Sequence, residues 1–194
     1  MKVGSGWEEA KLNEHPSDYI EALCKRCACI WGGLTASKKK LPAGMLRSSW
    51  EDMISGGFLS LLEGFSKVPF CSTEGRALMS MDLASFAAGV NPTAVLEHLD
   101  FDEKCYAPPI VEPRHGMSYV DTYIKVFYYP EEDVMQWIRQ NYQRYHLNHC
   151  LKLASNAFLT ADASNGITAD VALEAVKNIY HQENSSTLDE ADTH

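Results

Sequence analysis

The feature that most constrains the fold is a pair of amphipathic helical patterns joined at a single proline, Pro130. Before it, aromatic and aliphatic side chains recur at helical spacing from Tyr119 to Phe127 and so share one face. Pro130 has no amide hydrogen, and in a continuous helix its ring would clash with the carbonyl of Val126. It suits the first position of a new helix. We expect that second helix to run to about Phe158. Both helices need a partner for their apolar faces.

Helical patterns also fill most of the remaining chain. We expect further helices at about residues 16–34, 42–68, 73–89 and 93–98, and a last helix capped by Thr168. The stretch from 100 to 118 contains three prolines and no sustained period, which indicates a surface loop. No segment alternates with the period of two that marks a strand. The predicted fold class is therefore all-α.

The same patterns predict one helical domain over residues 16–182. Residues 1–15 are expected to be a disordered lead-in, with residues added for expression within Met1–Gly6. The polar, acidic segment 183–194 is expected to be a disordered tail. The predicted core consists of large apolar residues on the helix faces: Trp50, Phe58, Phe65, Leu78, Tyr123, Ile124, Trp137 and Ile138.

Two adjacent glycines, Gly56 and Gly57, interrupt the strongest helical pattern. Each costs a helix roughly 1 kcal/mol relative to alanine, so a structural reason for them is expected. The sequence leaves two reasons open. Either a neighbouring helix packs closely there or the helix bends.

The chain is acidic, with 26 acidic and 17 basic side chains among 194 residues and a formal charge of -9. This charge argues against binding to nucleic acid or directly to an anionic membrane. The only basic run, Lys38–Lys40, is interpreted as a solvated loop, with contact to lipid or an acidic partner as the alternative. No stretch has the length of a membrane span or the pattern of a secretion signal. The six cysteines are expected to be thiols in the cytosol.

Two clusters could hold a metal ion. Cys24, Cys27 and Cys29 resemble half of a zinc site, but the second half is missing, so we interpret them as small core residues. His146, His149 and Cys150 share one helix face. They are interpreted as a helix surface with one buried cysteine, and the alternative is a metal-dependent helical enzyme with His115 as a further ligand. No catalytic residue, metal or cofactor is predicted.

Two segments are candidates for partner binding. Glu74, Gly75 and Arg76 place a glycine between opposite charges at the head of an apolar helix. The alternative is that Glu74 and Arg76 only satisfy the start of that helix. The second candidate is the elbow, defined as Tyr128, Tyr129 and Pro130.

Three blocks of this sequence resemble the C-terminal region of the syndetin family in identity, order and spacing. They are Glu63-Gly64-Phe65-Ser66-Lys67-Val68, Cys71-Ser72-Thr73-Glu74-Gly75-Arg76-Ala77-Leu78-Met79-Ser80-Met81-Asp82, and Tyr119-Val120-Asp121-Thr122-Tyr123-Ile124-Lys125-Val126-Phe127-Tyr128-Tyr129 with Asp133 and Trp137-Ile138. The resemblance covers about residues 45–158. Residues 91–117 match no motif of this family.

The resemblance implies a C-terminal fragment of a longer protein that begins with coiled-coil segments. It implies an elongated antiparallel helical bundle, the rod of multisubunit tethering complexes, and no catalysis. Syndetin is the distinguishing subunit of the endosome-associated recycling protein complex (EARP complex). The implied partners are other tethering-complex subunits, SNARE proteins or a small GTPase. The implied location is peripheral, on recycling endosomes or the trans-Golgi network, with indirect membrane contact. An unrelated helical adaptor is the remaining alternative.

Overall fold

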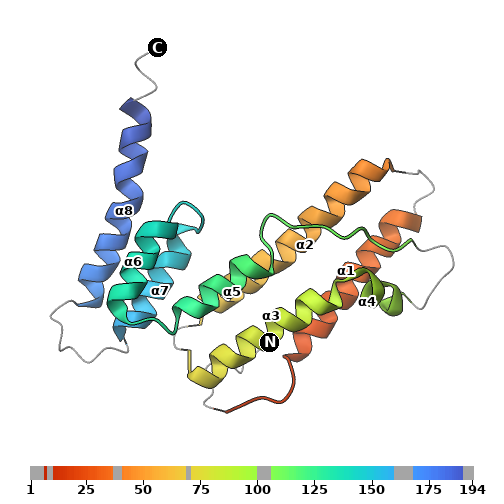
Figure 1. The fold of residues 1–194 in the computed structure, drawn as a ribbon, viewed down its shortest axis with the longest axis horizontal. Helices are drawn as coiled ribbons and strands as arrows, with labels where there is room; N and C mark the ends of the chain where they lie inside the picture. Colours follow the sequence, from red (N-terminus) through yellow and green to blue (C-terminus); the bar gives the residue numbers. More distant parts are fainter. Residues whose placement is uncertain are drawn as a thin grey trace. The chain divides into compact units, whose positions relative to one another are not determined.

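The computed structural model describes residues 7, 11–36, 41–68, 71–99, 106–159 and 168–189. Within these residues the regular elements are helical and there is no strand, which confirms the predicted all-α class (Figure 1). The chain forms two compact units, where the sequence led us to expect one domain over residues 16–182. Unit 1 comprises Met1–Phe65 and Cys71–Tyr123, and unit 2 comprises Ser66–Phe70 and Ile124–His194.

Unit 1 is built around four helices: α1 (Asp18–Ala36), α2 (Ala43–Ser66), α3 (Thr73–Gly89) and α4 (Pro92–His98). Helix α1 packs against α3 and α4, as Figure 1 shows. Aromatic pairs join α2 to its neighbours. Trp31 and Trp50 have ring centroids 5.2 Å apart, and Phe58 and Phe86 have theirs 5.1 Å apart, both edge to face. Such pairs contribute beyond the area that they bury.

Polar side chains cap the starts of α3 and α4. The Ser72 hydroxyl accepts a hydrogen bond from the amide of Gly75 at 2.9 Å. The Asn91 side chain accepts one from the amide of Ala94 at 2.9 Å, and Pro92 occupies the first helical position. Each cap satisfies a donor that the first helical turn leaves without an intrahelical partner.

The two central glycines of α2 have different surroundings. A Cβ atom at Gly57 would overlap the ring of Phe86 from α3, whereas nothing lies within 4 Å of the corresponding position at Gly56. Close packing of a neighbouring helix, one of the two expected reasons, therefore applies to Gly57.

Unit 2 contains α6 (Glu131–Asn141), α7 (Leu147–Leu159) and α8 (Ala169–Asp189), which all contact one another. The sequence predicts one helix from Pro130 to about Phe158, and this prediction is wrong. Asn141 ends α6, because its side chain donates to the carbonyl of Trp137 at 2.9 Å and its carbonyl accepts from Arg144 at 2.8 Å. The turn then brings the buried ring of Tyr145 to 5.0 Å from that of Trp137.

Helix α8 continues to Asp189. Residues 183–189 of the predicted disordered tail are therefore helical, and 190–194 lie outside the described residues. Helix α5 (Met117–Val126) begins in unit 1 and ends in unit 2. The eight predicted core residues each expose at most 8% of their surface: Trp50, Phe58, Phe65, Leu78, Tyr123, Ile124, Trp137 and Ile138.

A buried carboxylate, Asp82 of α3, joins Trp7, Ser17 and Tyr19 to α3 within unit 1. Its Oδ2 atom accepts hydrogen bonds from the indole nitrogen of Trp7 at 3.0 Å, the hydroxyl of Ser17 at 2.8 Å and the hydroxyl of Tyr19 at 3.2 Å. Its Oδ1 atom accepts one from the Ser17 amide at 2.7 Å. Hydrogen bonds of this kind offset the cost of removing a charge from water. Burial, together with the charge of Asp82, raises the pKa of Tyr19 above its usual value.

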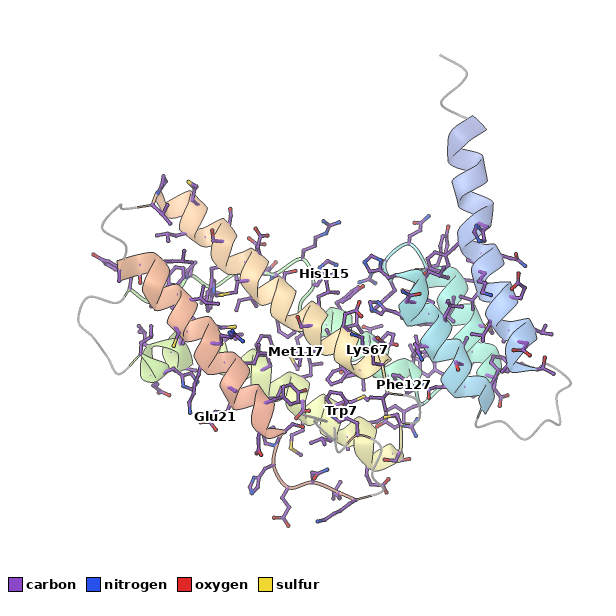
Figure 2. All side chains as sticks on the ribbon, turned by 180° about the vertical axis from the view of Figure 1, so that it is seen from behind. Trp7, Glu21, Lys67, His115, Met117 and Phe127 are labelled. Atoms are coloured by element: carbon purple, nitrogen blue, oxygen red, sulfur yellow. The ribbon has the colours of Figure 1, made fainter. Side chains whose placement is uncertain are left out.

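Trp7, labelled in Figure 2, has a defined place within residues 1–15, which were expected to be a disordered lead-in. Residues 1–6 and 8–10 of that prediction lie outside the described residues. The side chain of Trp7 is buried, and its ring meets those of Phe65 and Tyr19 edge to face at 4.9 and 6.0 Å. The backbone of Trp7 lies so close to α3 that a Cβ atom at Gly75 would overlap its carbonyl oxygen. Glycine at position 75 therefore leaves room for the backbone of Trp7.

Alanine substitutions at the two adjacent glycines of α2 should have opposite effects. Gly57→Ala is expected to lower the free energy of unfolding by about 1–3 kcal/mol, because the new methyl group overlaps the buried ring of Phe86. Gly56→Ala is expected to raise it by roughly 0.5–1 kcal/mol through helix propensity alone. Urea unfolding followed by circular dichroism measures both. Equal stability of the two variants would contradict the close packing.

The anchor around Asp82 predicts coupled losses of stability. Asp82→Asn should lower the free energy of unfolding by about 2–3 kcal/mol, because the NH₂ group of asparagine would face the donors that now bond to the carboxylate. Trp7→Phe should lower it by about 1 kcal/mol, because the indole hydrogen bond is lost. The double variant should lose less than the sum, since the indole bond is removed by either change. Urea unfolding measures the cycle, and Asp52→Asn, at an exposed position of α2, is the matched control. Strict additivity would show that the indole and the carboxylate do not interact.

The raised pKa of Tyr19 predicts a loss of stability in alkaline solution. Below the ordinary tyrosine pKa of 10.0, the hydroxyl is protonated in both states and its contribution is complete. Above that pH the unfolded state ionises first, so stability falls as pH rises. The stability difference between the native chain and Tyr19→Phe should be constant between about pH 7 and 9 and should shrink above about pH 10. Unfolding measured at each pH tests this, and a constant difference across the whole range would refute it.

Candidate functional site

The first candidate segment, Glu74 to Arg76, lies in the first turn of α3. Gly75 is buried beneath the backbone of Trp7, so this residue serves a contact within the chain. The Arg76 guanidinium lies 3.2 Å from the Thr73 hydroxyl, to which it donates. Glu74 is half-buried at the positive end of the helix, where a carboxylate is stabilising. This geometry matches the structural alternative, in which Glu74 and Arg76 satisfy the start of the helix.

The second candidate, the elbow, is open to solvent. Three tight backbone hydrogen bonds end the preceding helix, from the amides of Phe127, Tyr128 and Tyr129 to the carbonyls three residues earlier. Tyr128 and Tyr129 expose 51% and 45% of their surface. Pro130 is the N-cap of α6, whereas the sequence predicts it at the first helical position, so the helix begins one residue later than predicted. The elbow therefore offers exposed aromatic surface on a sharply defined turn.

The candidate metal ligands His146, just before α7, and His149 and Cys150, within α7, are held in different surroundings. His146 is exposed, whereas His149 and Cys150 are fully buried. The Tyr180 hydroxyl lies 3.1 Å from the Cys150 sulfur and 2.8 Å from the carbonyl oxygen of Tyr145. Burial raises the pKa of Cys150 to about 11, which disfavours the thiolate that a metal would need.

His115, the proposed further ligand, belongs to unit 1. Its Nδ1 atom lies 3.2 Å from the Ser55 hydroxyl, and its ring centroid lies 4.9 Å from that of Tyr119. In the part of the chain that the structure describes, no group of three or more histidine, cysteine or acidic residues is placed to hold a metal ion.

The cysteines of α1 occupy a helix face and its edge. Cys24 and Cys27 are buried and Cys29 is exposed, so the three do not converge on one point. Burial raises the pKa of the Cys24 thiol and raises that of Cys27 to about 11. Cys24 also packs against Gly89 of α3, where a Cβ atom would overlap the sulfur. These contacts are those of small core residues. Cys105 and the run Lys38–Lys40 lie outside the described residues.

The structure also shows a cavity that is not predictable from the sequence patterns. It has a volume of about 660 Å³ and lies where α1 ends and α2 begins. Its described lining consists of Trp31, Leu34, Thr35, Leu41, Ala43, Leu46, Arg47, Tyr106, Ala107 and Pro109. Helical periodicity marks Trp31 and Leu46 as core residues, but it says nothing of the irregular segment that carries Tyr106.

None of the helices in the described ranges is both long enough and apolar enough to cross a bilayer.

Comparison with known proteins places the chain in a family. Residues 3–171 match the family described as "Syndetin, C-terminal". Among curated proteins, syndetin of Gallus gallus is 25% identical over 169 residues, which are 85% of this chain and 16% of the relative. Syndetin of Mus musculus is 28% identical and that of Rattus norvegicus 27% identical, each over 137 residues, which are 70% of this chain and 13% of the relative.

The chain thus spans about a sixth or less of the length of these curated relatives. No solved structure matches it. The family match extends from before Trp7 into the first turn of α8 and so includes the Asp82 anchor, the elbow and the cavity. On this evidence the chain belongs to the syndetin C-terminal family.

Proposed function

We propose that this chain is a non-enzymatic interaction module of a vesicle-tethering complex subunit that acts in endocytic recycling. The observation that carries the proposal is the family match over residues 3–171. The proposed partners are other subunits of the tethering complex, with SNARE proteins or a small GTPase as further partners. The proposed location is peripheral, on recycling endosomes or the trans-Golgi network, with the membrane reached through these partners.

The elbow is the proposed contact surface. Tyr128 and Tyr129 are exposed, and aromatic side chains provide large contact areas in protein interfaces. The turn and the start of α6 hold their backbone in place, so little conformational freedom is lost on binding. Weak contacts at one elbow gain strength when several subunits bind together. Gly75, by contrast, is assigned to the packing of Trp7.

The acidic charge of the chain supports protein partners over nucleic acid. With a formal charge of -9, the chain repels phosphate backbones and anionic lipid headgroups at long range. Glu131, Glu132 and Asp133 directly follow the elbow, so a partner with basic residues around an apolar patch would fit it best.

The proposal predicts selective recovery of tethering-complex subunits. The 194-residue chain serves as bait in cytosol, with bound proteins identified by mass spectrometry. Tyr128→Ser/Tyr129→Ser should reduce recovery of these subunits about tenfold, as expected when exposed aromatic anchors are removed from an interface. Val171→Ser, which changes an exposed apolar residue in the same unit, is the matched control and should bind normally.

The Glu74→Arg/Arg76→Glu variant, tested in the same experiment, separates the two candidate segments. Normal recovery with this variant is expected, because the first turn of α3 is assigned to internal contacts. Circular dichroism must show unchanged helicity for every variant. If the native chain recovers no tethering-complex subunit, the proposed function fails. If the elbow variant binds as well as the native chain, only the assignment of the elbow fails.

A further inference from the structure

The cavity at the junction of α1 and α2 is a defined structural feature of unit 1. Trp31 forms part of its wall, and the edge-to-face contact with the buried Trp50 holds the Trp31 ring. The indole nitrogen of Trp31 donates to the backbone carbonyl of Tyr106 at 2.6 Å. This hydrogen bond holds the irregular segment that supplies Tyr106, Ala107 and Pro109 to the lining. Two parts of the chain 75 residues apart are therefore joined around the cavity.

The walls are mainly apolar, and the hydroxyl of Thr35 in the lining is already hydrogen-bonded within the protein. The Thr35 hydroxyl lies 3.0 Å from the carbonyl of Trp31 and 3.1 Å from that of Gly32, so it is bonded to its own helix. The remaining uncharged lining is provided by aliphatic, aromatic and proline side chains. A ligand that fills this space must itself be apolar, since a polar one would lose its hydrogen bonds to water.

One charged side chain stands out in this lining. Among the described residues around the cavity, Arg47 is the single ionisable side chain apart from the tyrosine, and it is exposed to solvent. It lies in the second turn of α2, whose first turn also lines the cavity and contains no acidic residue. A guanidinium binds a carboxylate through two parallel hydrogen bonds. The opening of the cavity therefore favours an anionic group.

We propose that this cavity binds an amphiphilic carboxylate, a fatty-acid-like molecule whose apolar chain fills the space and whose carboxylate pairs with Arg47. The volume of about 660 Å³ falls within the range of small-molecule sites, which also combine an apolar lining with a few polar groups. The charge of Arg47 selects an acid over a neutral lipid. This inference concerns a ligand of unit 1 and is independent of the partner surface proposed at the elbow.

Fluorescence titration of the 194-residue chain with dansylated undecanoic acid tests the proposal. Palmitate serves as the competitor, and hexadecanol, which has the same chain length without the carboxylate, serves as its uncharged counterpart. Two variants change the site: Arg47→Glu reverses the charge, and Ala43→Trp places a large side chain at the cavity. The matched controls are Arg26→Glu and Ser48→Trp, at exposed positions of α1 and α2 outside the described lining.

Saturable binding is expected with the native chain, displaced by palmitate and far less by hexadecanol. Arg47→Glu should weaken binding about tenfold, a typical effect of losing one charged contact, and Ala43→Trp should abolish it. Both controls should bind as the native chain does. Absence of saturable binding to the native chain would overturn the proposal, and so would native-like binding by both site variants. Equal displacement by hexadecanol would overturn the pairing with Arg47. Because Arg47 is exposed, its substitution tests the site without disturbing the core.

Discussion

The carboxylate of Asp82 is fully buried, and the positions of Trp7 and Ser17, which precede α1, depend on the hydrogen bonds that it accepts. A buried charge is tolerated only where donors replace the water that it has lost. Here the donors come from three residues of the N-terminal segment and its first helical turn. The buried carboxylate in α3 and the donors of Trp7, Ser17 and Tyr19 therefore stabilise one another. The bare α-carbon of Gly75 completes the arrangement by allowing the Trp7 backbone to approach.

Local chemistry made most of the helices predictable from the sequence. Apolar periodicity and the capping residues Ser72 and Asn91 mark the starts of α3 and α4, because both signals act over a few residues. The break between α6 and α7 was missed because the apolar face continues through it to Tyr145, and only the turn around Asn141 separates them. A signal for the anchor was present. Asp82 falls at helical spacing between Leu78 and Phe86, so a carboxylate lies within a buried stripe.

The candidate surfaces were harder to predict, since they depend on contacts between distant residues. The sequence shows a glycine between opposite charges at position 75, but it could not show that the backbone of Trp7 packs there. The elbow was predictable because proline and its acidic neighbours fix the turn locally. The cavity was not, because one of its walls is an irregular segment held by a hydrogen bond from Trp31 to a backbone carbonyl. Because every residue has a backbone carbonyl, the residue types do not reveal which one Trp31 binds.

The distance along the chain between Trp7 and its acceptor also has a consequence for biosynthesis. Trp7 is translated 75 residues before Asp82. At the usual synthesis rate of 5–20 residues per second, Asp82 is made roughly 4–15 seconds after Trp7. For most of that interval Trp7 has neither its aromatic neighbour Phe65 nor the Asp82 carboxylate, because Phe65 is made only shortly before Asp82. The Trp7 side chain is thus made early in unit 1, but its hydrogen bond to Asp82 can form only after the first half of α3 has been synthesised.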